Sequence, residues 1–266
     1  MQLIIGLILA VTSSYLAYRI QSLSKDGAVA AAFIGTIIFG LGGWQWAVLL
    51  LAFFISSSAL TRAFKDRKGG LDEKYSKSGH RDASQVFSNG GIAALFVLLH
   101  AFLPQATWAL PAFAAVLAAV NADTWATELG VLNPNPPRLI TDMRKSVEKG
   151  TSGAISIYGT IAALLGAAFI GSLAVIFFPN SHGSLFLLVT ISGLLGSLLD
   201  SLLGATVQAI YFCPKDNKET EKHPLHSCGT PTVQIRGWKW LNNDLVNVAC
   251  GVCGATIPLL AAIVGH

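Results

Sequence analysis

The sequence predicts an all-α, polytopic integral membrane helix bundle with about eight transmembrane helices, and two observations support this prediction. Of the 266 residues, 53% are hydrophobic and only 12% are charged, whereas soluble domains carry about 25% charged residues. The chain also contains eight apolar runs that are long enough to cross about 30 Å of hydrocarbon, at residues 3–18, 27–43, 44–60, 83–103, 108–129, 153–178, 184–212 and 247–264.

The first three runs need separate consideration. The first has no basic residue before it and no small-residue cleavage site, so we expect a retained helix rather than a signal peptide. Because no Arg/Ser-rich transit sequence precedes it, a prokaryotic plasma membrane is the expected location. The second and third runs are short and meet at "GLGGWQW", so they form either two crossing helices or a hairpin that does not fully cross. Residues 1–266 are interpreted as one transmembrane domain.

The basic residues predict the topology. All 18 Lys and Arg residues fall in four segments, residues 19–25, 62–81, 138–149 and 215–239, which alternate with connections that carry none. The positive-inside rule then puts all four segments in the cytoplasm and both termini outside, with larger cytoplasmic loops near 61–84, 130–150 and 213–242. This cationic face could bind membrane lipid, phosphate or nucleotide. Nucleic acid is not an expected partner, because no aromatic residues interleave with the basic runs.

Four acids stand apart from the basic loops. Asp123, Glu128 and Asp200 lie within apolar runs, and Asp244 lies at the start of the last one. A lone carboxylate at the centre of a membrane helix costs about 2.5–3.5 kcal/mol, so each requires a partner or a water-filled cavity. The alternative to a functional site is that Asp123 and Glu128 each bond a neighbouring helix and fix its packing.

Helical geometry separates the two acids of "NADTWATELG". At 100° per residue Asp123 and Glu128 are about 140° apart, whereas Asn121, Thr124 and Glu128 share a face. Asp200 lies in "GLLGSLLDSLLGATVQ", on a stripe of small residues that lets helices approach closely. The Asp-hydroxyl pairs of "ADT" and "LDS" resemble counterparts that face each other across a cavity.

Such an arrangement of hard oxygen ligands suits Mg²⁺. The candidate metal ligands are Asp123, Asp200 and Asp244, with Lys and Arg side chains available for the remaining phosphate charge. These features together predict a phosphoryl-transfer site.

Polar residues at predicted helix ends supply further candidates. In "KSGHRDASQVFSNGG" the side chains of Arg81, Gln85 and Asn89 follow one helical stripe that begins near Lys77, and they form either a cavity wall or interhelical amide bonds. "KGTSG", residues 149–153, precedes the sixth run and offers N–H groups and hydroxyls at a helix N-terminus, which suits phosphate.

"NNDLVN" opens the last run, where Asn243 and Asn247 lie one turn apart and serve either as ligands or as helix caps. Cys250 and Cys253 lie deep in that run, where packing is the expected role. Cys213, His226 and Cys228 share a loop and form a weaker candidate zinc site, because Cys213-x-x-Asp216 lacks the second cysteine of ordinary zinc patterns.

The ordered set "KSGHRDASQVFSNGG", "NADTWATELG", "TDMRKSVEKGTSGAIS", "GSLLDSLLGATVQ" and "WLNNDLVN" resembles the membrane family once called domain of unknown function 92. That family includes transmembrane protein 19 and the phytyl-phosphate kinase of tocopherol synthesis. The resemblance covers nearly the whole chain. It implies phosphoryl transfer from a nucleoside triphosphate, CTP or ATP, to an isoprenyl monophosphate, giving the diphosphate.

The preferred hypothesis combines the resemblance with the residues. Asp123 and Asp200 hold Mg²⁺ on the nucleotide, and Arg81, Arg144 and Lys145 neutralise the developing charge. The alternatives are a transporter or flippase for an anionic lipid or metabolite, and a lipid-phosphate cytidylyltransferase. The candidate phosphate- and substrate-binding residues are Lys77, Gln85, Asn89, Asn121, Thr124, Glu128, Lys149, Thr151, Ser201, Gln208, Asn243 and Asn247.

Overall fold

The structure is a computed structural model that describes residues 1–64, 74, 79–178 and 184–264. Within these residues, eight helices are long and apolar enough to cross a membrane, which confirms the predicted helical bundle. The helices are α1 (Gln2–Arg19), α2 (Lys25–Ile37), α3 (Trp44–Ala63), α4 (Ala83–Phe102), α5 (Ala109–Gly130), α6 (Ile157–Phe177), α7 (Leu185–Thr206) and α8 (Asn243–Val264). Lys77 lies outside the described residues.

The second and third apolar runs form two separate spans. α2 continues into a π-helical turn, η1 (Ile38–Gly42), and together they give a span of 18 residues, while α3 has 20. Gly43 joins them with φ 87°, a conformation that a residue with a Cβ rarely adopts. Both spans therefore have a length that suits a full crossing.

α5 is the central helix of the bundle. It contacts α3, α4, α6, α7 and α8, and its residues from Ala112 to Ala122 are all buried. Most of these residues are alanines, whose small side chains let the neighbouring helices approach. At Gly196 of α7, an added Cβ would lie 2.6 Å from the Ala119 Cβ and 2.8 Å from the carbonyl oxygen of Cys250. The small-residue stripe of α7 therefore packs tightly against α5 and α8.

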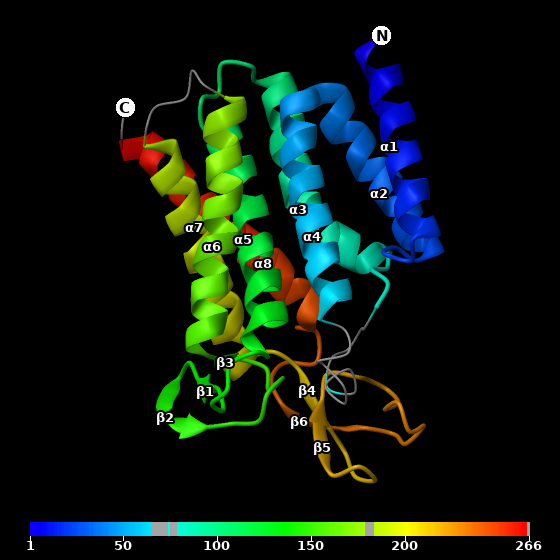
Figure 1. Cartoon of the computed structure of the whole chain (residues 1–266), viewed down its shortest axis with the longest axis vertical. Coiled ribbons are helices and arrows are strands. Elements are labelled where there is room, and N and C mark those ends of the chain that lie inside the picture. The colour runs from blue at the N-terminus through cyan, green and yellow to red at the C-terminus, as the bar shows by residue number, and fades with distance from the viewer. Residues whose placement is uncertain (65–73, 75–78, 179–183, 265–266) are drawn as a thin grey trace.

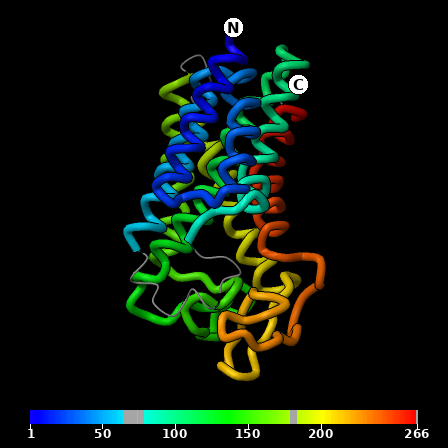
Figure 2. The backbone as a smooth tube through the Cα atoms, turned by 90° about the vertical axis from the view of Figure 1, so that its right-hand side faces the viewer, coloured from blue at the N-terminus to red at the C-terminus, as the bar shows by residue number. Residues whose placement is uncertain are grey.

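The two ends of the bundle differ in character. α1 begins and α8 ends at one end, while all the strands lie at the other, which we call the strand-bearing end (Figures 1 and 2). The described parts of the basic segments gather at the strand-bearing end as well. Residues 138–149 and 215–239 contain strands of this end, and the backbone of Arg81 pairs with the α1–α2 connection, which carries the first basic segment. The assignment of this end to the cytoplasm stays a prediction.

Two small antiparallel sheets cover the strand-bearing end, and the sequence prediction had no strands there. One has the order β2 (Asp142–Ser146), β1 (Arg138–Leu139), β3 (Ala154–Ile155). The other has the order β5 (Lys218–Thr220), β4 (Ile210–Cys213), β6 (Val233–Arg236).

The strands correct two predicted helix boundaries. The sixth helix begins at Ile157 rather than at 153, and the seventh ends at Thr206 rather than at 212. Residues 210–212 are apolar, so hydropathy alone extends the helix through them, yet a short apolar run is equally compatible with a buried strand. Their β-branched and aromatic side chains favour the strand.

Candidate functional site

A cavity of about 800 Å³ opens at the strand-bearing end. It is lined by polar residues from α3 to α8 and from the connections that carry the strands. Segments that are far apart in the sequence thus meet around one space. The predicted site residues that line it are Arg81, Gln85, Asn89, Asp123, Thr124, Glu128, Lys149, Thr151, Asp200, Ser201, Gln208, Asn243 and Asn247.

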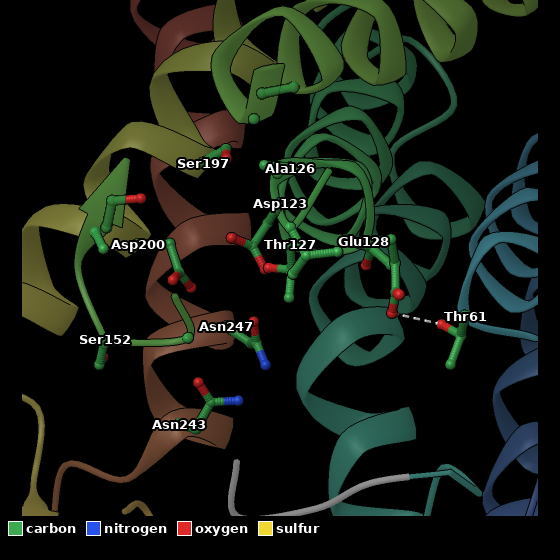
Figure 3. Close-up of a pocket in the computed structure, with 18 of the residues that line it drawn as sticks. Thr61, Asp123, Ala126, Thr127, Glu128, Ser152, Ser197, Asp200, Asn243 and Asn247 are labelled. Carbon is green, nitrogen blue, oxygen red and sulfur yellow. Dashed lines mark hydrogen bonds between the residues drawn. The ribbon is translucent and has the colours of Figure 1, made fainter. Parts of the chain in front are cut away.

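Asp123 and Asp200 face this cavity from two helices. Figure 3 shows them projecting into the same space between α5 and α7, as the "ADT" and "LDS" comparison predicted. The Oδ2 atom of Asp200 is buried and has no hydrogen-bond partner among the described residues. An ionised oxygen in that state is costly unless a cation or proton accompanies it.

A third carboxylate, from Glu221, lines the same cavity. It follows β5 and faces the same space as Asp123 and Asp200. Gln208 holds it in place, because its Nε2 donates to Glu221 Oε1 at 2.9 Å while its Oε1 accepts from Ser152 Oγ at 2.9 Å. The convergence of three acids favours a bound cation.

Two amides stand beside the carboxylates. Asn243 and Asn247 point into the cavity from the start of α8 (Figure 3). The backbone N–H of Leu245 donates to Asn242 Oδ1 at 3.0 Å, so Asn242 caps the helix. Asn242 therefore serves as the cap, and Asn243 and Asn247 line the cavity, where their role as ligands stays a prediction.

Arg81 is held beside the cavity by contacts of both its backbone and its side chain. Its backbone pairs with Ser22 and Ser24, and its guanidinium lies 5.5 Å and 5.4 Å from the ring centroids of Phe53 and Phe54. Burial lowers the pKa of Arg81 to about 10, while the charge of Glu128 opposes that shift. The guanidinium therefore stays charged at neutral pH and is available to an anionic group.

Lys149 and the segment after it form the rim. The Lys149 ammonium donates to the carbonyl of Val131 at 2.9 Å, which fixes it beside the end of α5. Gly153 has φ 80°, and a Cβ there would lie 2.2 Å from the backbone N of Ala205, so only glycine fits this approach to α7. "KGTSG" is not at the start of α6 as predicted, because β3 intervenes. Ser156 caps α6 instead, accepting from Gly159 N at 3.1 Å.

Glu128 lies apart from the other acids, as the helical spacing predicted. Its Oε1 accepts from Thr61 Oγ1 of α3 at 2.8 Å, and Figure 3 shows it on the side of α5 away from Asp200. The side chain is only 4% exposed. We therefore interpret Glu128 as the counter-charge of Arg81 rather than as a direct partner of Asp123.

Two predicted binding residues have packing or capping contacts. Asn121 is fully buried outside the cavity, where it accepts from Ser56 and Ser57 at 3.1 Å and donates to the carbonyl of Gly166 at 2.8 Å. It therefore links α3, α5 and α6 instead of binding substrate. Gln85 forms a capping box with Asp82 at the start of α4, although it also lines the cavity.

Three further residues lie away from the predicted site. Arg144 and Lys145 are exposed on β2 and do not line the cavity, because the predicted loop segment "TDMRKS" pairs with β1 as an outer strand. Asp244 also lies outside the cavity, and its Oδ2 accepts from Ser84 Oγ at 2.5 Å, a contact between α8 and α4. Asp244 is therefore not positioned to act as a ligand beside Asp123.

The cavity also contains residues that the sequence interpretation missed. Arg62 and His80 line it, as do Ser156 and Glu221. Arg62 lies in the last turn of α3 and Glu221 follows β5, both within basic segments of the sequence, where neither periodicity nor spacing distinguishes them from topology-setting charges. Only their place in the fold identifies them.

The candidate zinc residues come together outside the cavity. Cys213, His226 and Cys228 offer ligand atoms within 4.8 Å of one another, and Asp216 belongs to the same group. Asp216, which occupies the position of the second cysteine of ordinary zinc patterns, therefore offers a carboxylate oxygen to the same cluster.

Comparison with known proteins agrees with the bundle architecture. The integral membrane protein family DUF92 matches residues 8–255. Protein PGR of Arabidopsis thaliana is 34% identical over 98% of this chain and 96% of its own length. An uncharacterized membrane protein of Methanocaldococcus jannaschii is 34% identical over 77% and 82%. Protein VTE6, chloroplastic, of Arabidopsis thaliana is 26% identical over 91% and 66%.

No solved structure matches the chain. The family match runs from within α1 to within α8, a range that contains every cavity residue named above. The chain therefore belongs to the integral membrane protein family DUF92.

Proposed function

We propose that the cavity transfers a phosphoryl group, with Mg²⁺, from a nucleoside triphosphate to an isoprenyl monophosphate of the phytyl or geranylgeranyl type. The observation that carries this proposal is the meeting of Asp123, Asp200 and Glu221 with Arg81 and Lys149 around one cavity. This combination suits a metal-bound polyphosphate, because the carboxylates can bind the metal ion and the cationic side chains can bind the phosphate oxygens.

The donor set fits Mg²⁺. Asp123 and Asp200 offer hard carboxylate oxygens, one of them buried without a hydrogen-bond partner among the described residues. Mg²⁺ takes one or two carboxylates, keeps waters and binds substrate phosphates. Asp123 and Asp200 would hold it, and when bound it would neutralise charge on the nucleotide phosphates.

The remaining residues would position the reactants. Asn243 and Asn247 would orient phosphate or metal-bound water, while Arg81, Arg62 and Lys149 would offset phosphate charge. An oxygen of the lipid phosphate forms a bond to the γ-phosphorus as the bond to the β–γ bridging oxygen breaks, and the nucleoside diphosphate leaves. The nucleophile is already ionised, so no strong general base is needed and orientation is the main contribution.

A second, apolar cavity supports a lipid substrate. It has a volume of about 80 Å³ and is lined mainly by apolar residues of α1 to α4 and the adjoining segments, including Leu23 of the α1–α2 connection and Phe39 of η1. Arg81, Gln85 and Asn89 line both cavities. A phosphate beside Arg81 would thus have an apolar surface next to it, where the start of a prenyl chain could lie while the rest extends into lipid.

Family membership supports the same reaction. The motifs resemble a family that includes the phytyl-phosphate kinase of tocopherol synthesis, and the chloroplastic protein VTE6 is a relative of this chain. We assign the strand-bearing end to the cytoplasm, where nucleotides are available, on the positive-inside rule. The prokaryotic plasma membrane stays a prediction from the sequence.

The distribution of acids favours this proposal over a transporter. Transport would be supported by acids spread across the membrane thickness. Among the described spans, Asp123, Glu128 and Asp200 instead line a single cavity at one end. Cytidylyl transfer to the same lipid phosphate would use the same groups, and its products distinguish it.

The test is a turnover assay. Purified protein in detergent is incubated with Mg²⁺, labelled CTP or ATP, and phytyl, geranylgeranyl or farnesyl monophosphate. We expect a lipid diphosphate, and we expect turnover to fall by about 10²–10³-fold or more in Asp123→Asn and Asp200→Asn. Asp142→Asn, an exposed acid of β2, is the matched control and should keep full turnover.

Two outcomes would contradict the proposal. One is the absence of lipid diphosphate with every nucleotide and lipid tested, although the protein elutes as a folded species. The other is release of pyrophosphate with a nucleotidyl-lipid product, which would identify the cytidylyltransferase instead.

A further inference from the structure

Four potential metal ligands converge in the β4–β5–β6 sheet, outside the cavity described above. Cys213 ends β4, Asp216 lies in the turn to β5, and His226 and Cys228 lie in the connection from β5 to β6. Their ligand atoms all lie within 4.8 Å of one another. Residues from three separate segments thus point to one small space.

The distances match the edges of a tetrahedral site. With Zn–S near 2.3 Å and Zn–N or Zn–O near 2.0–2.2 Å, neighbouring ligand atoms lie about 3.3–3.8 Å apart. Cys213 Sγ is 3.5 Å from Cys228 Sγ and 3.8 Å from Asp216 Oδ2, and His226 Nδ1 is 3.4 Å from Cys228 Sγ. His226 Nδ1 and Asp216 Oδ2 are closer, at 2.8 Å, a contact that an ion between them would lengthen.

A tight turn of the backbone positions His226 and Cys228 for metal binding. The backbone N–H of His226 donates to the carbonyl of Thr230 at 2.9 Å, and Gly229 N donates back to the His226 carbonyl at 2.9 Å. Gly229 has φ 78°, so this tight turn requires the left-handed conformation that glycine tolerates. The turn places Cys228 opposite Cys213, and both Cys213 and His226 are buried.

The sheet needs such a crosslink because it has little core of its own. The buried apolar side chains of its strands belong to β4, while Leu225, Val233 and Ile235 are 54%, 59% and 50% exposed. A segment this short cannot bury enough apolar surface to order itself. Small domains of that kind are commonly stabilised by a structural metal.

We propose that Cys213, Asp216, His226 and Cys228 bind a structural Zn²⁺. Two thiolates and an imidazole select zinc over Mg²⁺ or Ca²⁺, and the carboxylate completes four protein ligands, which closes the site to substrate. The two sulfurs are 3.5 Å apart, well beyond the 2.03–2.05 Å of a disulfide. The two cysteines are therefore positioned to bind one metal ion rather than to form a disulfide.

The site would act on the cavity at a distance. Gln208 precedes β4 and Glu221 follows β5, and these two cavity residues bond each other at 2.9 Å. Anchoring β4 to the β5–β6 connection therefore keeps Glu221 facing the cavity. This proposal does not rest on the phosphoryl-transfer proposal, since the metal would stabilise the sheet whatever the cavity does.

The first measurement is the metal content of the full-length chain. The protein is purified in detergent without chelator, and its metals are measured by mass spectrometry. We expect about one zinc per chain. After mild chelation, added Co²⁺ should give the absorption of a tetrahedral thiolate site. A wild-type chain with no zinc and no such Co²⁺ spectrum would overturn the proposal, as would a Cys213–Cys228 disulfide found by thiol alkylation.

Substitutions then assign the ligands. Cys228→Ser and His226→Ala should lose most of the zinc, whereas Cys253→Ser, a cysteine in α8 away from the cluster, should keep it. Asp216→Cys should bind zinc at least as tightly as the wild type, because a thiolate replaces a carboxylate. Zinc retained in both Cys228→Ser and His226→Ala would show that the ion lies elsewhere. If a loss variant does not fold, the wild-type content and Asp216→Cys still decide.

Discussion

The interior of the helical bundle and the β4–β5–β6 sheet are stabilised in different ways. In the bundle, α5 contacts five other helices, and its residues from Ala112 to Val120 are all apolar and buried. In the sheet, the buried apolar side chains of the strands belong to β4, Val233 and Ile235 of β6 are exposed, and Cys213 and His226 are buried. From this difference we infer that the stability of the bundle comes from close packing, whereas the stability of the sheet depends on the metal ion that its polar side chains bind.

Removal of the metal should produce the largest difference between the bundle and the sheet, measured as amide hydrogen exchange. A zinc chelator should raise amide hydrogen exchange in residues 207–242 by more than about 100-fold, because binding free energy of a structural zinc is folding free energy. Exchange in α5 should stay slow, since its packing does not involve the metal. Equal loss of protection in α5 and in the sheet would show that the two regions are not independent.

A methyl group placed in a tight contact between helices should have the second-largest effect. Gly196→Ala puts a Cβ 2.6 Å from Ala119, so we expect a loss of about 1–3 kcal/mol in stability. Gly91 of α4 has no atom within 4 Å of an added Cβ, so Gly91→Ala should instead gain about 0.5–1 kcal/mol. Denaturant unfolding in detergent measures both, and the same sign for the two variants would contradict the packing account.

The smallest expected effect concerns an ion pair at the strand-bearing end whose acid is exposed. Lys74 donates to Glu148 at 2.6 Å, and this hydrogen bond and the lysine charge lower the pKa of Glu148. Since the folded-state pKa is the lower one, the stabilisation exists above the ordinary glutamate pKa and is lost as pH falls through the folded value.

The Glu148 side chain is 81% exposed, so solvent screening limits the effect of Glu148→Gln to less than about 0.5 kcal/mol at pH 7. The measurement is the thermal midpoint of both proteins at pH 7 and at pH 3. We expect the deficit of the variant to shrink at the lower pH, and a deficit that grows on acidification would contradict a lowered Glu148 pKa.

The bundle was predictable because apolar runs of membrane length have few alternative structures. The pairing of Asp123 with Asp200 was predictable too, since two Asp-hydroxyl steps occur on apolar helices that run in the same direction. Glu128 was correctly separated from Asp123 by helical spacing alone. These predictions all rest on the regular geometry of a helix.

The strand-bearing end was not predictable by the same means. Residues 210–212 look like a helix end by hydropathy, and Arg144 and Lys145 look like site cations by proximity in sequence, yet both segments are strands. Asp216 and Glu221 gain their places through the β4–β5 hairpin and through the pairing of β4 with the more distant β6. Contacts of that kind leave no periodic signal in the sequence.

The central claim, that Asp123 and Asp200 hold a divalent cation for phosphate chemistry, is tested most directly by metal binding. Mn²⁺ shares the oxygen-ligand preference of Mg²⁺, and its free form can be followed by electron paramagnetic resonance during titration with nucleotide present. We predict that the chain binds Mn²⁺ and that Asp123→Asn and Asp200→Asn weaken binding by about 10-fold or more, while Asp142→Asn binds as the wild type does. Equal Mn²⁺ binding by all four proteins would contradict the claim.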